Sequence, residues 1–393
     1  MAPNLKTTKT GREMSKKRSI FEDVGSDEKV KVAAPQPGAI DRAPKGARGG
    51  IRIWLMVIFV LVALMVLVGG LTRLTDSGLS ITEWKPVTGA IPPMTDADWA
   101  SEFTKYQASP EFQLQNSAMT VDEFKSIYWW EWGHRQLGRF VGVVWAVGFL
   151  FFWLTKRIPT GWTGRLLGLG ALGGLQGAIG WWMVSSGLTG RMVDVASYRL
   201  ATHLGLAFVI LGLSAWYIFL MSRTDADLMA ARRGREAKLV SMSTGLMHLA
   251  FLQILLGALV AGIDAGRGYI DWPLMGGQVI PDGMFDYVPW WSNFFENPAL
   301  VQFIHRLFGY LTFIFVIVIW QRSRSSGNRK TQAAFNMVMA MVLVQVILGI
   351  TTVMMAAQIH VALTHQAGAI LLWVMILRAR FLAGYPVAQS VRG

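Results

Sequence analysis

Three residues with ionisable side chains lie within one helical turn, at the point where a long apolar segment begins. Glu131, His134 and Arg135 supply a carboxylate, an imidazole and a guanidinium, and the chain after them stays largely apolar to about Thr155. Ionisable groups are costly in or beside the hydrocarbon of a membrane and are usually functional there. A carboxylate and an imidazole at positions i and i+3 share one face of a helix and can transfer protons. We therefore take Glu131 and His134 as the candidate catalytic residues.

Three further histidines lie near the starts of apolar segments. His305 is followed by Arg306 in the same way as His134 is followed by Arg135, and His203 and His365 lie near the starts of two other segments. Imidazole is the commonest metal ligand, and one histidine from each of two helices supplies both axial ligands of a haem iron. For a single intramembrane histidine, a hydrogen bond to a neighbouring helix explains the residue equally well. Four histidines that obey an internal repeat favour ligation.

The composition is that of a membrane protein. Of 393 residues, 53% are hydrophobic and only 16% are charged, against about 25% charged residues in soluble domains. The net charge of +13 does not indicate a nucleic-acid partner, because the basic residues lie mostly in short loops beside apolar runs. The chain contains no cysteine, which excludes disulfides, thiolate metal sites and thiol catalysis.

Eight segments are apolar enough and long enough to cross a membrane. The first four are predicted at about 51–71, 131–155, 164–186 and 199–221, and the last four at about 239–262, 300–320, 332–356 and 359–379. Basic residues gather in alternate connections, which the positive-inside rule assigns to the cytoplasm together with both termini. These basic residues are Lys156, Arg157, Arg165, Arg223, Arg232, Arg233, Arg235, Lys238, Arg322, Arg324, Arg329, Lys330, Arg378 and Arg380.

The second half of the chain repeats the first. Asp76 and Trp84 recur as Asp264 and Trp272, a shift of 188 residues, and the dipeptide at 134–135 recurs at 305–306, a shift of 171. The shift shrinks further along the chain, as loops of different length in the two copies require. The remaining matches are Gln176 with Gln345, Gly180 with Gly349, and His203 with His365.

The repeat predicts the architecture. Each copy has four spans, and an even number preserves orientation, so equivalent residues lie on the same side of the membrane. We predict an all-α polytopic membrane protein with two tandem, parallel-related four-helix bundles and all four matched histidines in the outer half of the bilayer. The predicted divisions are a disordered basic tail at 1–50, an N-terminal bundle at 51–221, a basic inner linker at 222–238, a C-terminal bundle at 239–382 and a tail at 383–393.

One long connection on the outer side, residues 72–130, belongs to the N-terminal bundle. Within it, the run from Thr95 to Asp98 predicts the start of a short helix, and the run from Thr120 to Glu123 matches a capping box.

The two copies differ at the carboxylate. Gln302 stands where the first copy has Glu131, whereas the histidines are duplicated. This difference predicts two haem sites with different tasks, one able to do proton chemistry and one suited to carrying electrons. Arg135 and Arg306 could pair with haem propionates, and the alternative for both is snorkelling at the membrane interface.

Two other histidines do not follow the repeat. His248 aligns with Val60 and falls in the inner half, so a structural or cavity-lining place is expected. His360 lies five residues before His365, which is a poor match to one helical face, and we expect it at the interface.

Several long runs of the sequence resemble the haem A synthase family, in its proteobacterial and mitochondrial branch. The resemblance extends over about residues 51–382. The runs are GGLTRLTDSGLSITEWKPVTGAIPP at 69–93, SPEFQLQNSAMTVDEFKSIYWWEWGHRQLGR at 109–139, SYRLATHLGLA at 197–207, LVAGIDAGRGYIDWPLMGG at 259–277, QFIHRLFGY at 302–310 and ALTHQAG at 362–368.

The resemblance implies an oxidoreductase that converts a methyl group of haem O to a formyl group, making haem A for cytochrome oxidase. It implies that His134 and His203 bind the substrate haem and that His305 and His365 bind a haem B cofactor, with the four histidines as axial iron ligands. Glu131 falls on the family's functionally important acidic position. Some branches carry a cysteine pair in the outer loops, and this chain has none.

The resemblance also implies the location and the partners. The expected location is a bacterial inner membrane, or the mitochondrial inner membrane in a eukaryote. A haem O synthase, cytochrome oxidase assembly factors and membrane lipid are the implied partners, without nucleic acid, and a homo-oligomer is left open.

Two other functions fit part of the pattern. One is a quinol-linked electron-transfer protein with two b-type haems and no chemistry on them. The other is a transporter built from repeated halves, which the outer position of the histidines and the lack of intramembrane Asp/Glu pairs disfavour.

Overall fold

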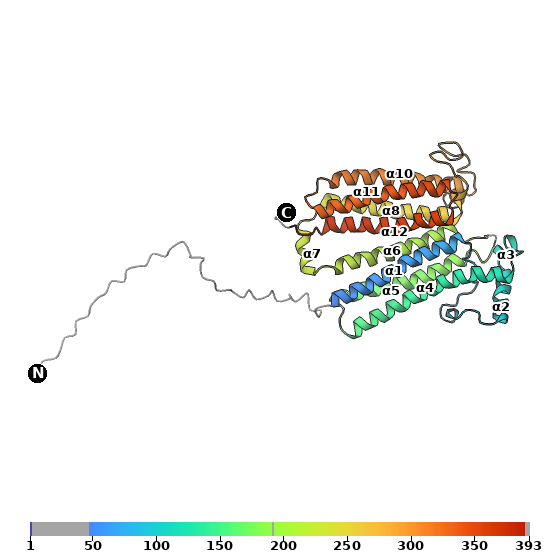
Figure 1. Ribbon diagram of the computed structural model, residues 1–393, viewed down its shortest axis with the longest axis horizontal. Coiled ribbons are helices and arrows are strands. Elements are labelled where there is room, and N and C mark those ends of the chain that lie inside the picture. The colour runs from blue at the N-terminus through green and yellow to red at the C-terminus, as the bar shows by residue number, and fades with distance from the viewer. Residues whose placement is uncertain (2–46, 191, 390–393) are drawn as a thin grey trace. The chain divides into compact units, whose positions relative to one another are not determined.

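In the computed structural model, which describes residues 1, 47–190 and 192–389, eight helices are long and apolar enough to cross a membrane (Figure 1). No strand occurs in these ranges. The prediction of an all-α polytopic protein with eight membrane-spanning helices is confirmed. In chain order the spans are α1 (Ala47–Leu74), α4 (Val121–Leu154), α5 (Thr163–Val184), α6 (Ser197–Met221), α8 (Ala237–Gly262), α10 (Pro298–Ser323), α11 (Arg329–Met354) and α12 (Ile359–Gly384).

The second span begins earlier than the sequence indicated. We expected it to start at about 131, but α4 is one continuous helix of 34 residues from Val121. The capping box is present: the Thr120 side chain accepts from the backbone of Glu123, and the Glu123 carboxylate accepts from the backbone of Thr120. At 1.5 Å per residue, α4 is about 50 Å long, whereas the hydrocarbon core is about 30 Å thick. The Glu131–Arg135 cluster therefore lies inside a helix that extends beyond the membrane.

The extension of α4 is supported by the outer connection, which folds against it. This connection contains η1 (Thr88–Ala90), α2 (Asp96–Gln107) and α3 (Pro110–Leu114). Helix α2 begins at the predicted helix start, where Thr95 and Asp98 form a capping box. Phe103 and Tyr106 of α2 form a small hydrophobic core with Phe124 and Tyr128 of α4 and with Ile81.

The inner ends of the helices are joined by shorter segments. The predicted linker at 222–238 contains helix α7 (Asp225–Arg232). The segment after α12 is held in place, because Tyr385 O accepts from Arg223 at 2.8 Å and Val387 O accepts from Asn328 at 2.9 Å. Of the predicted tail at 1–50, residues 2–46 lie outside the described residues, and 47–50 form the start of α1.

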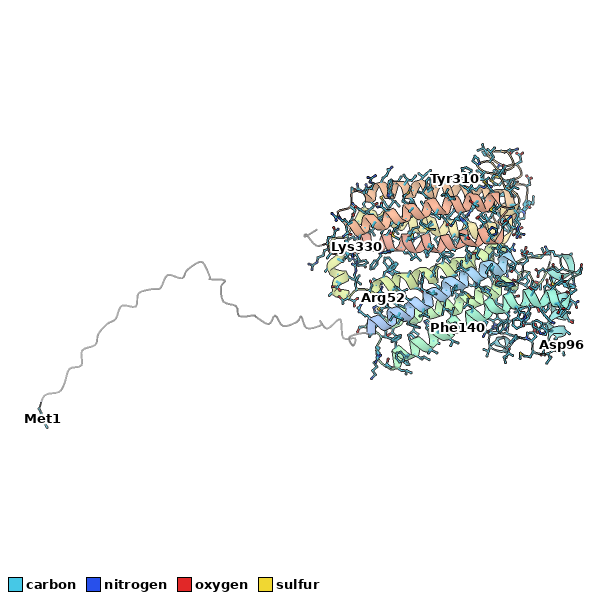
Figure 2. All side chains as sticks on the ribbon, viewed as in Figure 1. Met1, Arg52, Asp96, Phe140, Tyr310 and Lys330 are labelled. Carbon is cyan, nitrogen blue, oxygen red and sulfur yellow. The ribbon has the colours of Figure 1, made fainter. Side chains whose placement is uncertain are left out.

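The two ends of the bundle carry different loops. Asp96, in the connection before α4, lies at the opposite end of the helices from Lys330, which opens α11, and Arg52 of α1 lies toward the same end as Lys330 (Figure 2). This arrangement places the basic connections on one side, as the loop pattern predicts.

Helix contacts within each half form a closed ring. Helix α1 packs on α4 and α6, and α5 packs on the same two helices. The second half repeats this pattern, with α8 and α11 each packing on α10 and α12. These contacts support the division into two four-helix bundles, which were predicted from the repeat.

The halves meet through the first and fourth helices of each ring. Helix α6 packs on α8 and α12, and α1 packs on α12. Trp373 Nε1 of α12 donates to Phe208 O of α6 at 3.1 Å, and Gln366 Nε2 of α12 donates to Val66 O of α1 at 2.8 Å. Because α1 corresponds to α8 and α6 to α12 in the repeat, the contact of α6 with α8 is the counterpart of that of α12 with α1.

Candidate functional site

The four repeat-related histidines lie on the second and fourth helices of each ring. His134 of α4 interacts electrostatically with His203 of α6, and His305 of α10 does so with His365 of α12. All four side chains are partly buried. The structure therefore brings each predicted pair together, with one histidine from each of two facing helices.

Glycines on neighbouring helices face the second-helix histidines. A Cβ added at Gly69 of α1 would lie 3.3 Å from His134 Nε2, and one added at Gly257 of α8 would lie 3.1 Å from His305 Cε1. Gly69 and Gly257 are themselves related by the 188-residue shift. Both histidines can occupy these places because the facing residue has no side chain.

The fourth-helix histidines face glycines of the third helices in the same way. A Cβ at Gly180 of α5 would lie 2.8 Å from His203 Cε1, and one at Gly349 of α11 would lie 3.2 Å from His365 Cε1. His365 Nδ1 is buried and has no hydrogen-bond partner among the described residues. Paired imidazoles, each packed on glycine, and an unpartnered ring nitrogen fit a ligand held between two histidines, such as a haem.

Three glutamines bind the backbone of the histidines. Gln176 Nε2 donates to His203 O at 2.9 Å, Gln345 Nε2 to His365 O at 2.8 Å, and Gln253 Nε2 to His305 O at 3.0 Å. Each glutamine lies on the helix that also supplies the facing glycine. Gln176 and Gln345 were matched in the repeat without an assigned role, and Gln253 was not singled out at all.

The Glu131 carboxylate is buried, with 2% of the residue exposed, and both of its oxygens have partners. Oε1 accepts from Arg135 Nε at 3.0 Å and from Nη2 at 2.6 Å. Oε2 accepts from Ser80 Oγ and from the backbone N–H of Ile81, both at 2.7 Å. The buried charge is therefore balanced by a guanidinium and by the loop that follows α1.

Arg135 and Arg306 bind equivalent loops. Arg135 donates to Ile81 O at 2.7 Å and to Glu83 O at 3.1 Å. Arg306 donates to the backbone oxygens of the residues 188 positions further on, Tyr269 O at 3.1 Å and Asp271 O at 2.9 Å. In each half the arginine next to the histidine thus ties the second helix to the loop after the first. A further partner of Arg135 is the ring of Trp181, 5.7 Å from the guanidinium carbon.

Gln302 makes a different contact from its counterpart Glu131. Its Nε2 donates to Tyr269 O at 3.0 Å, whereas Glu131 accepts from the N–H of Ile81. The side chain at this position therefore acts as an acceptor in the first half and as a donor in the second. An amide cannot take up a proton at neutral pH, so only the first half has a side chain at this position that can exchange protons.

The two remaining histidines lie away from the pairs. His248 is exposed on α8, and its Nδ1 lies 2.9 Å from Thr244 O. His360 is exposed at the start of α12, as expected for an interfacial residue. No group of three or more His, Cys, Asp or Glu residues suited to a metal ion occurs in the described ranges.

An ionic cluster joins the two halves at their outer ends. Arg73 Nη1 binds Asp76 at 2.7 Å, and its Nη2 binds Asp264 at 2.8 Å and lies 3.6 Å from Asp194. Asp76 and Asp264 are repeat-related and share a left-handed backbone, with φ of 48° and 51°. One arginine of the first half therefore binds the same aspartate position in both copies.

Glu111 of α3 lies beside this cluster and is 3% exposed. Burial, with Asp194 as a further cause, raises the pKa of the Glu111 carboxyl to about 8. The burial of this group could not be predicted from the sequence, because it depends on where α3 lies in the folded protein.

The comparisons with known proteins cover nearly the whole chain and agree with one another. Residues 52–377 match the COX15-CtaA family model, described as cytochrome oxidase assembly protein. Heme A synthase of Ruegeria sp. (strain TM1040) is 63% identical over 378 residues, covering 96% of this chain and 99% of that protein. Heme A synthase of Paracoccus denitrificans (strain Pd 1222) is 61% identical, covering 96% of this chain and 99% of that protein. The chain therefore belongs to the COX15-CtaA family of haem A synthases and cytochrome oxidase assembly proteins.

Proposed function

We propose that this protein is a haem A synthase, which oxidises a methyl group of haem O to a formyl group. The observation that carries the proposal is the presence of two matched histidine pairs, each packed against glycines, with a carboxylate beside only one pair. Two similar haem sites would serve an electron carrier equally well. The added carboxylate gives one site the means to move protons, as an oxidation of a carbon atom requires.

The first half is the proposed substrate site. His134 and His203 would hold haem O through its iron, with Gly69 and Gly180 leaving space beside their rings. Glu131 would accept a proton or orient water during the oxidation. The partners of the two carboxylate oxygens indicate which oxygen would take the proton. The Ser80 hydroxyl can rotate away from Oε2, whereas the guanidinium that binds Oε1 is also held by two backbone oxygens. Oε2 is therefore the atom proposed to take the proton.

The second half is the proposed cofactor site. His305 and His365 would hold haem B, which when bound supplies one-electron transfer. Gln302 keeps the position next to His305 uncharged, so the site can change redox state without a neighbouring carboxylate changing its proton content. Arg135 and Arg306 have protein partners on most of their donors, and a propionate would be an additional partner for each.

The proposed setting is the inner membrane with both termini in the cytoplasm. The basic connections lie at one end of the bundle and the histidine pairs toward the other. Haem O synthase would supply the substrate, and cytochrome oxidase assembly factors would receive the product. The N-terminal ring is proposed as the substrate domain and the C-terminal ring as the cofactor domain.

Pigment analysis of the purified protein tests this function. The full chain is produced with and without a haem O synthase, and its haems are extracted and separated by chromatography. Haem A, or the alcohol formed on the way to it, is expected only when haem O is supplied. Haem B alone under both conditions would instead identify an electron-transfer protein.

A matched pair of variants tests the assignment of the halves. His305→Ala is expected to lower the haem B content, and His248→Ala, outside both sites, is expected to leave it unchanged. Normal haem B and normal product in His305→Ala would overturn the cofactor assignment.

A further inference from the structure

One backbone contact is shared by three of the four histidines and is missing at the fourth. Three of them have a glutamine on the neighbouring helix that donates to their backbone oxygen. For His134, no side-chain hydrogen bond of this kind occurs among the described residues. The 188-residue shift that relates α1 to α8 places Met65 where the second half has Gln253.

The packing confirms that Met65 and Gln253 occupy equivalent places. A Cβ added at Gly138 of α4 would lie 3.2 Å from Met65 Cε, and one added at Gly309 of α10 would lie 3.4 Å from Gln253 Nε2. Gly138 and Gly309 are the repeat-related glycines four residues after His134 and His305. The two side chains therefore reach across the same helix pair to the same point, one with an amide and the other with a thioether.

The chemical difference concerns how firmly the histidine is held. The Gln253 amide donates to His305 O at 3.0 Å, so it joins α8 to α10 at the backbone of the histidine. A methionine thioether has no donor, and its flexible chain packs in several rotamers. Partners that orient a ligating histidine typically change affinity for the metal group by roughly 10- to 100-fold.

We propose that Gln253 is a positioning residue that makes the second half retain its haem, and that Met65 leaves the first half able to release its haem. The inference rests on the proposed function, in which the second half keeps a cofactor while the first exchanges substrate for product. A cofactor site benefits from a ligand that cannot move. A substrate site whose histidine was held as firmly would bind the product haem too tightly and slow each turnover.

Haem transfer to an excess of apomyoglobin measures retention directly in the purified full-length protein. Gln253→Met, which keeps the size of the side chain and removes its donor, is expected to lose haem B about tenfold faster than the parent protein. A changed reduction midpoint potential of the remaining haem B is expected as well, because the orientation of the ligand changes. Gln366→Met is the matched control, since Gln366 is a glutamine of α12 that donates to Val66 O rather than to a histidine. Its haem B is expected to leave within about twofold of the parent rate.

The reciprocal variant tests the first half and does not depend on how well Gln253→Met folds. Met65→Gln places a donor opposite His134 and is expected to slow the release of haem A to the same acceptor about tenfold, with haem B retention unchanged.

The outcomes separate the inference from the proposed function. Parent-like haem B loss in Gln253→Met, or equal acceleration in Gln366→Met, overturns the role of Gln253. Parent-like release from Met65→Gln overturns the role of Met65. If the parent protein holds no haem B, or His305→Ala retains it fully, the proposed function fails and the inference fails with it.

Discussion

At the scale of single residues, Glu131 differs in charge from its repeat partner Gln302, whereas an arginine follows four residues later in both halves. Its carboxylate is balanced by Arg135 and by two donors from the loop after α1. A buried carboxylate with this many donors is held in one orientation. The same contacts also give Glu131 a structural role, because they attach the loop after α1 to α4. A test of its chemistry must therefore separate catalysis from folding.

Replacing Glu131 by glutamine preserves the size of the side chain and one acceptor oxygen, but removes the charge. We expect Glu131→Gln to bind both haems and to form product at least about 100-fold more slowly, the usual effect of losing an acid–base group. The measurements are haem content and haem A formed from supplied haem O. Glu123→Gln, at the exposed start of the same helix, serves as the control and is expected to act normally. Normal haem A formation by Glu131→Gln would exclude the acid–base role.

Glu111 makes the stability of the outer segment depend on pH. Its pKa is raised by burial from 4.5 to about 8, so between these values the folded protein binds a proton that the unfolded chain has lost. Stability contributed by this group therefore falls as pH rises from about 4.5 to about 8 and stays low above that range. We expect Glu111→Gln to melt at a higher temperature than the parent protein at pH 9, with little difference at pH 5. The same difference at both values would contradict a raised pKa.

At the scale of helices, glycine positions decide where the histidines can lie. Each of the four glycines that face a histidine is on a different helix, and at each of them the histidine ring of the neighbouring helix approaches the glycine closely. Close approach of helices through small residues is a common way to pack helices in membranes. Here the space freed by glycine is occupied by an imidazole ring.

Alanine at these glycines should displace the histidine and weaken haem binding in one half only. We expect Gly349→Ala to lower haem B content and Gly180→Ala to lower haem O binding without loss of haem B. Gly173→Ala is the control, because a Cβ there would meet nothing within 4 Å. Since alanine favours a helix by about 1 kcal/mol over glycine, any loss must come from contact with the ring. Full haem B content in Gly349→Ala would show that the ring can move aside.

At the scale of the whole molecule, the two halves are joined by equivalent helix contacts and also by the ion pairs of Arg73, which the repeat does not duplicate. Helices α6 and α12 each pack on the first helix of the other half. Arg73 has Ala261 as its repeat partner, so its ion pairs with Asp76 and Asp264 occur once. The Arg73 side chain lies between the repeat-related Asp76 and Asp264 and links the outer ends of the two halves.

Arg73→Gln is expected to lower the thermal stability of the protein in detergent. The arginine side chain is 11% exposed, but Asp76 and Asp264 are 52% and 34% exposed and are partly screened by solvent. We therefore expect a loss of about 1–2 kcal/mol, less than for a fully buried pair. Lys125→Gln, whose partner Asp122 is 90% exposed, should leave the melting temperature unchanged. An equal effect of both variants would argue against a bridge between the halves.

The sequence alone determined the spans, the repeat and the histidine pairs. Membrane crossing requires about 20 apolar residues, so seven of the eight helices could be located to within about five residues. The repeat then identified His134, His203, His305 and His365 as equivalent positions without any structural information, because a duplicated chain keeps equivalent residues in corresponding spans. The same alignment revealed the exchange of Glu131 for Gln302.

Only the tertiary structure decided which groups contact one another. The early start of α4 depends on aromatic packing against α2, and the burial of Glu111 depends on the position of α3. The contact of Gln253 with His305 joins residues 52 positions apart. Such contacts arise from the packing of helices that are distant in the chain. They therefore cannot be predicted from the local pattern of polar and apolar residues. The shared glutamine at three histidines, and its absence at His134, could therefore be recognised only once the helices were in place.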